Sequence, residues 1–452
     1  MKELLPSDFL RLVQEQYGED LAREFCAALS STEPEVSVRL NRWKCPVGHF
    51  PQDQPVAWCP DAFYLSERPS FTFDPLFHAG TYYVQEASSM FLAQVLQQYV
   101  SEPVVALDLC AAPGGKSTLL RSLLPEDSLL VSNEPIRQRA QILAENTIKW
   151  GHPSVVVSQN YPADFTPLEN FFDLVLADVP CSGEGMFRKD EEAIRDWSLQ
   201  NVEQCSLRQR DILEAVWPAL KPGGLLVYST CTFNRQEDEE NVQWLGHHLG
   251  AEELPIAHSA EWGIEGHHHF LPGKARGEGF FLALLRKAEE SGEKRFTFPK
   301  AGKDKRMSHA PQEPKSLREW VKGDFAYVLQ NDTYTAFPAA YAEHLAVLQH
   351  HLHLLVFGVQ IAEQKGRDWV PSHALAMSKA FRSETFPQVE LSYEDSIAYL
   401  RRESIQIEAP RGIVLLCHQG FPLGFAKNLG NRANNLYPQE WRIRSQFPVS
   451  ET

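Results

Sequence analysis

Two cysteines stand just beyond apolar segments in the middle of the chain, and their positions suit nucleophilic chemistry. Cys181 follows Leu174–Ala177 and lies three residues after Asp178, and Cys231 follows Leu225–Tyr228. Both apolar segments have the character of buried parallel strands. The carboxyl ends of such strands meet at one edge of a sheet, where ligands bind. Cysteine is more often a small buried hydrophobic residue than a nucleophile, but two of them at one edge with a nearby aspartate favour catalysis.

This set of residues suits methylation at a carbon that is not nucleophilic by itself, such as C5 of a pyrimidine. A thiolate that adds to C6 makes the ring enamine-like, so that C5 can attack a methyl donor, after which the C5 proton and the thiolate leave. Asp178 is placed to stabilise charge at N3 of the ring. The second cysteine is a candidate for assisting product release. Lys116 is a candidate for lowering a thiol pKa or stabilising the developing charge.

The segment Val104–Thr118, VVALDLCAAPGGKST, offers a ledge for the donor. Its pattern predicts a buried strand, a glycine-rich turn and the first turn of a helix. Small residues let backbone N–H groups approach a ligand, and a helix N-terminus favours negative charge. The predicted cofactor contacts in this turn are Cys110, Ala111, Ala112, Pro113, Gly114, Gly115 and Lys116.

A phosphate-binding loop is the alternative interpretation of this turn. Gly115-Lys116-Ser117 fits the end of that motif, but Cys110 stands where the motif requires glycine, and Pro113 lacks a backbone N–H. The GxGxxG pattern of dinucleotide-binding proteins is missing as well. A nucleoside without a polyphosphate remains, and S-adenosylmethionine fits. Glu134 follows the second predicted strand, where an acidic residue accepts both ribose hydroxyls.

Apolar segments alternate with helical patterns from Val104 onward, which predicts an α/β fold with a doubly wound parallel sheet. The predicted strands are Val104–Leu109, Ser128–Ser132, Val155–Val157, Leu174–Ala177 and Leu225–Tyr228, with a last pair near Ala251–Ile256 and Gly279–Leu285. The predicted helices are Ser117–Leu124, Ile136–Trp150 and Asn201–Leu220, the last ending at Pro222-Gly223-Gly224.

Four domains are predicted from shifts in composition: 1–100, an N-terminal subdomain; 101–288, the catalytic domain; 289–390, a linker and small mixed α/β domain; and 391–452, a small β-barrel. In the first, the patterns predict a helix over residues 4–29 with Ser7 as N-cap, a strand at Val36–Arg42, a non-helical stretch at Cys45–Phe77 and a helix at Tyr82–Tyr99. In the last, they predict a helix at Ser392–Arg401 and strands at GIVLLCH, GFPLGFAKN and WRIRS.

The charge is unevenly distributed along the 452 residues, whose net charge is −16. Lys294–Lys322 holds nine basic residues against three acidic ones, and Arg411–Arg444 holds five against one. These segments suit RNA, although a solvated linker explains the first equally well. The eight cysteines show no CxxC pairing, which is typical of a reducing compartment. With no signal sequence and no apolar segment of membrane-spanning length, we expect a cytoplasmic protein without membrane contact.

Three long motifs in this order resemble the Nop/Sun family of RNA cytosine-5 methyltransferases: DLCAAPGGKST (Asp108–Thr118), DVPCSGEGMFRKD (Asp178–Asp190) and YSTCTFNRQEDEENV (Tyr228–Val242). The resemblance implies a Rossmann-like class I methyltransferase core that binds S-adenosylmethionine. It implies that Cys231 attacks C6, that Cys181 serves product release, and that Asp178 and Lys116 belong to the active site. The loop from Cys110 to Lys116 would line the cofactor, and Glu134 would hold its ribose. Where many members carry an aspartate for the adenine side, this chain has Asn160, with Asp164 as the fallback.

The end of the chain, GFPLGFAKNLGNRANNLYPQEWRIRS, is similar to the PUA-like RNA-binding barrel of the bacterial RsmF-like branch of that family, whose substrate is small-subunit (16S) ribosomal RNA. The segment SVRLNRWK (Ser37–Lys44) resembles the family's N-terminal RNA-contacting segment. We therefore expect ribosomal RNA as partner. A tRNA cytosine-5 methyltransferase and a non-catalytic RNA-binding assembly factor stay open as alternatives, and the oligomeric state is unknown. No metal is expected, because His267-His268-His269 has no partner at ligand spacing and is predicted to form a surface turn.

Overall fold

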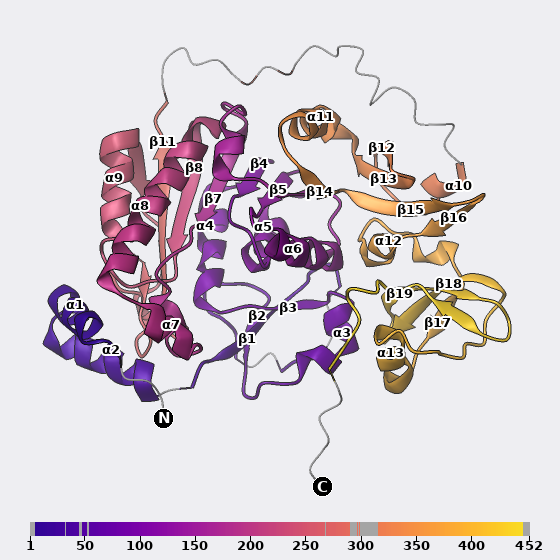
Figure 1. The fold of residues 1–452 in the computed structure, drawn as a ribbon, viewed down its shortest axis with the longest axis horizontal. Coiled ribbons are helices and arrows are strands. Elements are labelled where there is room, and N and C mark those ends of the chain that lie inside the picture. Colours follow the sequence, from indigo (N-terminus) through magenta and orange to yellow (C-terminus); the bar gives the residue numbers. More distant parts are fainter. Residues whose placement is uncertain are drawn as a thin grey trace, which may run out of the picture.

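A large mixed sheet forms the centre of the molecule in the computed structural model (Figure 1), which describes residues 5–31, 33–44, 48–51, 54–266, 268–289, 296, 298 and 315–445. Its nine strands run in the order β10-β11-β8-β7-β4-β5-β6-β14, with β9 pairing β11. They are β4 (Val105–Asp108), β5 (Leu129–Asn133), β6 (Val155–Ser158), β7 (Phe172–Asp178), β8 (Leu220–Thr230), β9 (Ala251–Leu254), β10 (His269–Phe270), β11 (Phe280–Lys287) and β14 (Leu354–Phe357).

The five central strands, β4 to β8, are parallel, and helices cover both faces of the sheet. Leu107 of β4 packs in one core with α8 (Leu199–Val216) and α9 (Glu239–Leu249). Ala106 packs in another, with α4 (Leu92–Tyr99) and α5 (Gly115–Leu123). Neighbouring strand residues point to opposite faces, so the apolar runs seen in the sequence fill both cores. The predicted doubly wound α/β fold is confirmed, with α6 (Arg137–Trp150) as predicted.

One predicted helix end in this domain is wrong. The sequence predicts that a helix continues to Leu220 and ends at Pro222-Gly223-Gly224, but α8 ends at Val216 and β8 begins at Leu220. A 3₁₀ turn, Trp217–Ala219, which contains Pro218, separates the two. Proline cannot continue the helical hydrogen bonding, so the helix stops before the glycines.

The N-terminal part differs from the prediction in four ways. Residues 4–29 are not one helix, because Gly18 (φ 79°) separates α1 (Ser7–Tyr17) from α2 (Glu19–Ser31). Pro6 rather than Ser7 occupies the N-cap of α1. Tyr82–Tyr99 is not wholly helical, since it begins with β3 (Tyr82–Val84). This strand pairs with β1 (Val36–Leu40), which also pairs with β2 (Ala62–Leu65). The non-helical prediction for Cys45–Phe77 missed the short helix α3 (Pro75–His78).

The C-terminal part contains two four-stranded sheets (Figure 1). The first comprises β12 (Phe325–Gln330), β13 (Thr333–Pro338), β15 (Val359–Lys365) and β16 (Asp368–Pro371). The second comprises β17 (Gln388–Glu390), β18 (Gly412–His418), β19 (Phe421–Asn428) and β20 (Ala433–Asn435), with α13 (Tyr393–Leu400) beside it. The predicted strand WRIRS is not a strand. The remaining helices are α7 (Glu191–Asp196), α10 (Lys315–Arg318), α11 (Ala342–His351) and α12 (His373–Met377).

One strand from the mixed region completes the central sheet. β14 pairs antiparallel with β6, so that Phe357 lies opposite Val156. Without it, β6 would be an exposed edge with unpaired backbone groups. The composition of the sequence gives no sign of this long-range pairing, which crosses the predicted boundary at residue 288. No helix in the part of the chain that the structure describes is long and apolar enough to span a membrane.

Arg39 of β1 joins the N-terminal sheet to the ledge helix α5. Its side chain is almost fully buried and lies 4.6 Å from the Trp150 ring. The guanidinium donates to Gln85 Oε1 (3.0 Å), Thr118 Oγ1 (2.6 Å) and the Gly115 carbonyl (3.3 Å). Arg39 therefore holds α5 in place, so it is not one of the exposed cations that an RNA-contacting segment implies.

Replacing Arg39 is expected to destabilise the protein strongly. Arg39→Met keeps the apolar stem but leaves several buried acceptors without a donor, which should lower the free energy of unfolding by about 3 kcal/mol. Arg42→Met is the matched control, because Arg42 only pairs with Asp61 at the surface, and such a pair contributes about 0–1 kcal/mol. Urea unfolding followed by circular dichroism measures both. Equal losses in the two variants would contradict the role assigned to Arg39.

Candidate active site

The ledge lies between β4 and α5, and a glycine is required at its tightest point. Gly114 has a left-handed backbone (φ 118°), and a Cβ there would lie 3.3 Å from Leu143 of α6. The peptide bond before Pro113 is cis. Gly115 is the first residue of α5, and the first N–H groups of a helix have no partner within the helix.

Asp108, the last residue of β4, is a site residue that the sequence prediction missed. Its side chain is fully buried, Ser117 donates to Oδ2 (2.6 Å), and Oδ1 has no hydrogen-bond partner among the described residues. The pKa of Asp108 is raised to about 7, mainly by burial and also by Asp178 and Glu134, while the hydrogen bond from Ser117 and the charge of Lys116 oppose the rise. A charged residue closing an apolar strand before a glycine turn is the signal that could have identified it.

Negative charge dominates the ledge. Burial raises the pKa of the Cys110 thiol, and the carboxylates of Asp108, Asp178 and Glu134 raise it further. Cys110 therefore stays a neutral thiol, which suits a lining residue rather than a nucleophile. A cation bound at this ledge would offset these buried carboxylates, whereas a phosphate would add to their repulsion.

Lys116 and Asp178, predicted as active-site residues from separate motifs, form an ion pair. Lys116 Nζ lies 2.8 Å from Asp178 Oδ2 and 5.1 Å from the Phe280 ring centre. Ser229 Oγ donates to the other carboxylate oxygen of Asp178 at 2.7 Å. The pair connects the ledge helix to the ends of β7 and β8.

Cys181 and Cys231 come together because their strands are parallel neighbours. Asp178 of β7 lies opposite Ser229 of β8, so the loops that follow leave the sheet side by side. The two Cα atoms are 6.4 Å apart, and the sulfurs are joined as a disulfide. The Cys231 N–H points at Cys181 Sγ at 3.3 Å. Thiol chemistry at either cysteine therefore requires the reduced protein.

Glu184 fixes these two loops to each other. Its carboxylate accepts hydrogen bonds from the backbone N–H of Phe233 (2.7 Å), from Trp197 Nε1 (2.9 Å) and from Asn234 Nδ2 (3.0 Å). The pKa of Glu184 is raised to about 7, mainly by burial and also by the neighbouring carboxylate of Glu237, against the three hydrogen bonds. The motif DVPCSGEGMFRKD contains Glu184, but its role was not predicted, because two of its three partners, Phe233 and Asn234, lie about 50 residues away along the chain.

Glu134 lies at the end of β5 close to the ledge, where the sequence predicts a ribose contact. It is buried, and Oε1 accepts the N–H of Ile136 at 3.0 Å. Glu134 Oε2 lies 3.4 Å from Arg139 Nη1, and Arg139 Nη2 donates a hydrogen bond to the Ala112 carbonyl. The preceding residue, Asn133, donates from one amide to the carbonyls of Leu109 and Asn160, and so ties three loops together.

Asn160 and Asp164 form a separate turn after β6. Asn160 Oδ1 accepts the N–H of His353 at 3.0 Å, and Nδ2 donates to Asp164 Oδ2 at 3.2 Å. Asp164 Oδ2 also accepts the N–H of Tyr161. Both side chains hold this turn next to β14, and Asn133 links the turn to the ledge.

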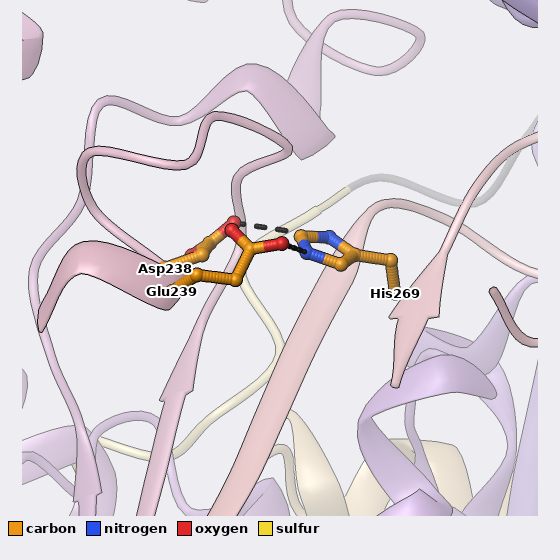
Figure 2. Close-up of side chains that lie close together, drawn as sticks. All are labelled: Asp238, Glu239 and His269. Atoms are coloured by element: carbon orange, nitrogen blue, oxygen red, sulfur yellow. Dashed lines mark hydrogen bonds and ion pairs between the residues drawn. The ribbon is translucent and has the colours of Figure 1, made fainter. Parts of the chain in front are cut away.

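The histidine run is not the surface turn that the sequence predicts. His269 belongs to β10, is 3% exposed and lies against Glu239 and Asp238 (Figure 2). His268 packs against Phe91 and His258, and His267 lies outside the described residues. Both carboxylates belong to the segment that follows Cys231, and only tertiary structure brings His269 to them.

Together the doubly wound sheet, the ledge and the paired cysteines define a Rossmann-like methyltransferase with an added N-terminal domain and a C-terminal PUA domain. Three family models match along the chain: the N-terminal domain of 16S rRNA methyltransferase RsmF over residues 5–87, 16S rRNA methyltransferase RsmB/F over 93–286, and the methyltransferase RsmF PUA domain over 386–443.

Curated relatives match almost the whole chain. The chain is 31% identical to ribosomal RNA small subunit methyltransferase F from Aeromonas hydrophila, over 96% of this chain and 97% of the relative. It is also 31% identical to the protein of that name from Cronobacter sakazakii, over 96% of each. The chain belongs to the ribosomal RNA small subunit methyltransferase F family, which confirms the resemblance seen in its motifs.

Solved structures agree with this fold. A methyltransferase homolog protein from Pyrococcus horikoshii is 26% identical, with a TM-score of 0.54 over 62% of this chain and 95% of that one. NSun6 from the same organism, solved with SFG, has a TM-score of 0.55 over 64% of this chain and 100% of that one. The latter is 21% identical and shows the shared fold alone.

The raised pKa of Asp108 predicts a pH-dependent effect of its replacement. Below about pH 4 the carboxyl is protonated in both the folded and the unfolded protein. As the pH rises to about 7 the unfolded chain loses this proton first, so folding weakens by about 1.4 kcal/mol per unit of pKa difference. Asp108→Asn removes this charge, so its melting temperature relative to wild type should rise between about pH 4 and pH 8.

Differential scanning calorimetry at several pH values measures this trend. The conservative replacement leaves an oxygen to accept from Ser117. Asp211→Asn is the control, because Asp211 is exposed on α8, and its difference from wild type should be small at every pH. A difference for Asp108→Asn that is constant with pH would contradict the predicted ionisation.

Proposed function

We propose that this protein methylates C5 of cytosine in 16S ribosomal RNA with S-adenosylmethionine as donor, and that Cys231 is the attacking nucleophile. The observation that carries the proposal is the convergence of Cys231, Cys181 and the Lys116–Asp178 pair at the end of the sheet that holds the ledge. The relatives' name, ribosomal RNA small subunit methyltransferase F, supports the substrate.

The charge of the ledge fits S-adenosylmethionine. This cofactor carries a sulfonium and an ammonium, and both would be favoured by the buried carboxylate of Asp108, whose Oδ1 has no partner among the described residues. The backbone of the loop from Cys110 to Gly115 would receive the amino-acid part, Glu134 the ribose, and Asn160 the adenine side. When bound, the cofactor supplies the methyl group.

Cys231 would begin the reaction on the target base. Its thiolate attacks C6, forming a carbon–sulfur bond and pushing electron density towards N3 and C5. As this charge develops, N3 would take up a proton from water. Asp178 would then accept one hydrogen bond from N3–H and one from the N4 amino group of cytosine. Uracil presents an oxygen in place of that amino group, which Asp178 would repel, so this pair favours cytosine. The Lys116 ammonium lies beside Asp178 and compensates charge that develops on the ring.

Cys181 would complete the cycle. After the methyl group has reached C5, the proton on that carbon must leave before the Cys231 thiolate can be expelled. Cys181 is the nearest second thiol, with its Cα 6.4 Å from that of Cys231, and in its thiolate form it can accept a proton. It is therefore proposed to serve product release.

Removing the nucleophile is expected to abolish the product. Reduced wild-type protein should transfer labelled methyl to small-subunit ribosomal RNA and yield 5-methylcytosine, whereas Cys231→Ala should be slower by at least about a thousandfold. Nucleoside analysis of ribosomal RNA and of tRNA, incubated in parallel, measures the product and the substrate class. Cys26→Ala, which removes a free cysteine of α2, is the control. Normal transfer by Cys231→Ala would exclude it as nucleophile, and labelling of tRNA alone would exclude ribosomal RNA.

Removing Cys181 is expected to trap the enzyme on its product. Cys181→Ala keeps Cys231, so the covalent bond to C6 still forms, but the release of RNA slows. A protein–RNA adduct that is stable on a denaturing gel, dependent on S-adenosylmethionine and lost in the double variant with Cys231→Ala, is the expected result. Full turnover by Cys181→Ala without any adduct would show that Cys181 has no part in release.

A further inference from the structure

A compact group of three buried side chains lies beside the segment that carries Cys231. Asp238 and Glu239 stand at the start of α9, and His269 comes from β10 across the sheet edge (Figure 2). His269 Nε2 is 3.0 Å from Glu239 Oε1, and His269 Nδ1 is 3.9 Å from Asp238 Oδ2. One ligand atom from each of the three residues lies within 4.8 Å of the others.

Several polar atoms of this group have no hydrogen-bond partner within the described part of the chain. They are Asp238 Oδ2, Glu239 Oε2 and His269 Nδ1. Asp238 is fully buried and His269 is 3% exposed. Buried polar atoms are rarely left without a partner, because each then loses its hydration without compensation. This pattern indicates that these atoms contact a bound ligand rather than other atoms of the protein.

The charge around the group calls for a cation. The carboxylates of Glu237 and Glu184 lie near enough to Asp238 to act on its charge, and Glu239 adds a third. His269 is the one basic group in direct contact with either carboxylate among the described residues, and the Arg235 charge acts on Glu239. Tyr17 packs over His269 and donates its hydroxyl hydrogen to the Phe233 carbonyl, so it adds no positive charge.

We propose that Asp238, Glu239 and His269 bind a divalent cation. Two carboxylates and one imidazole are ligands that Zn²⁺ and Mn²⁺ accept, and their two negative charges match the charge of the ion. Glu239 is the least buried of the three, with 16% of its side-chain surface exposed, so an ion would enter from its side. The binding of the ion does not depend on the substrate or on the roles assigned to Cys231 and Cys181.

The second oxygen of Asp238 connects this site to the catalytic segment. Asp238 Oδ1 accepts hydrogen bonds from Thr230 Oγ1 (2.5 Å) and Thr232 Oγ1 (3.1 Å), the residues on either side of Cys231. An ion on Oδ2 would fix the orientation of this carboxylate and with it both hydroxyls. The cation therefore acts as a positioning element for Cys231, through Asp238 and the two threonines that are hydrogen-bonded to this ligand.

Metal content of the whole protein tests the proposal. After treatment with a chelator, wild type should bind one Mn²⁺ per chain, followed by electron paramagnetic resonance, and one Zn²⁺ that survives desalting. His269→Gln and Glu239→Gln should each weaken binding by about a hundredfold or more. Glu240→Gln, at the exposed next residue of α9, is the matched control and should bind as wild type does. Reduced Cys181 and Cys231 offer thiolates to Zn²⁺, so Cys231→Ala must retain the ion.

Diffraction from wild-type crystals soaked in Mn²⁺ tests the site without any variant, so a folding defect cannot affect the result. An anomalous peak between Asp238, Glu239 and His269 is expected. Loss of binding in Cys231→Ala together with retention in His269→Gln would place the ion on the thiols and overturn the proposal. Failure of wild type to bind either ion at millimolar concentration would also overturn it.

Discussion

The parallel register of β4, β7 and β8 is the constraint on which the site depends. Asp108 lies opposite Leu176, and Asp178 lies opposite Ser229, so the three strands end at nearly the same level. Parallel strands separated by long connections have no turn to fix their pairing, and the register is set instead by apolar residues that must enter the two cores. Once the register is set, the ledge, the Lys116–Asp178 ion pair and both cysteines lie at one edge of the sheet.

Buried negative charge distinguishes this ledge from a phosphate-binding loop with a similar appearance. Asp108 and Glu184 are both buried, and burial raises the pKa of each to about 7. Such carboxylates destabilise the protein unless a cation or a set of donors compensates them. Glu184 has three donors, whereas Asp108 has one. Glu184, whose hydrogen bonds are satisfied, therefore has a structural role, whereas Asp108 is suited to bind a charged ligand.

Segments before and after the catalytic domain in sequence contact the elements that form the site. Arg39 reaches from the N-terminal sheet to the carbonyl of Gly115, and β14 protects the β6 edge beside the turn of Asn160. The N-terminal helices α1 and α2 pack around Phe233, two residues after Cys231. The segments that surround the catalytic domain in sequence therefore limit the movement of its loops, which gives them a mechanical role besides any contact with RNA.

The sequence by itself determined the parallel core, the ledge and the proximity of Cys181 to Cys231, because apolar strand patterns and motif positions are local properties. It did not determine the β14–β6 pairing or the burial of His269, since each depends on residues far away along the chain. The roles of Asp108 and Glu184 were hidden for the same reason. Whether a carboxylate is buried, and which donors reach it, is decided only when distant segments pack together.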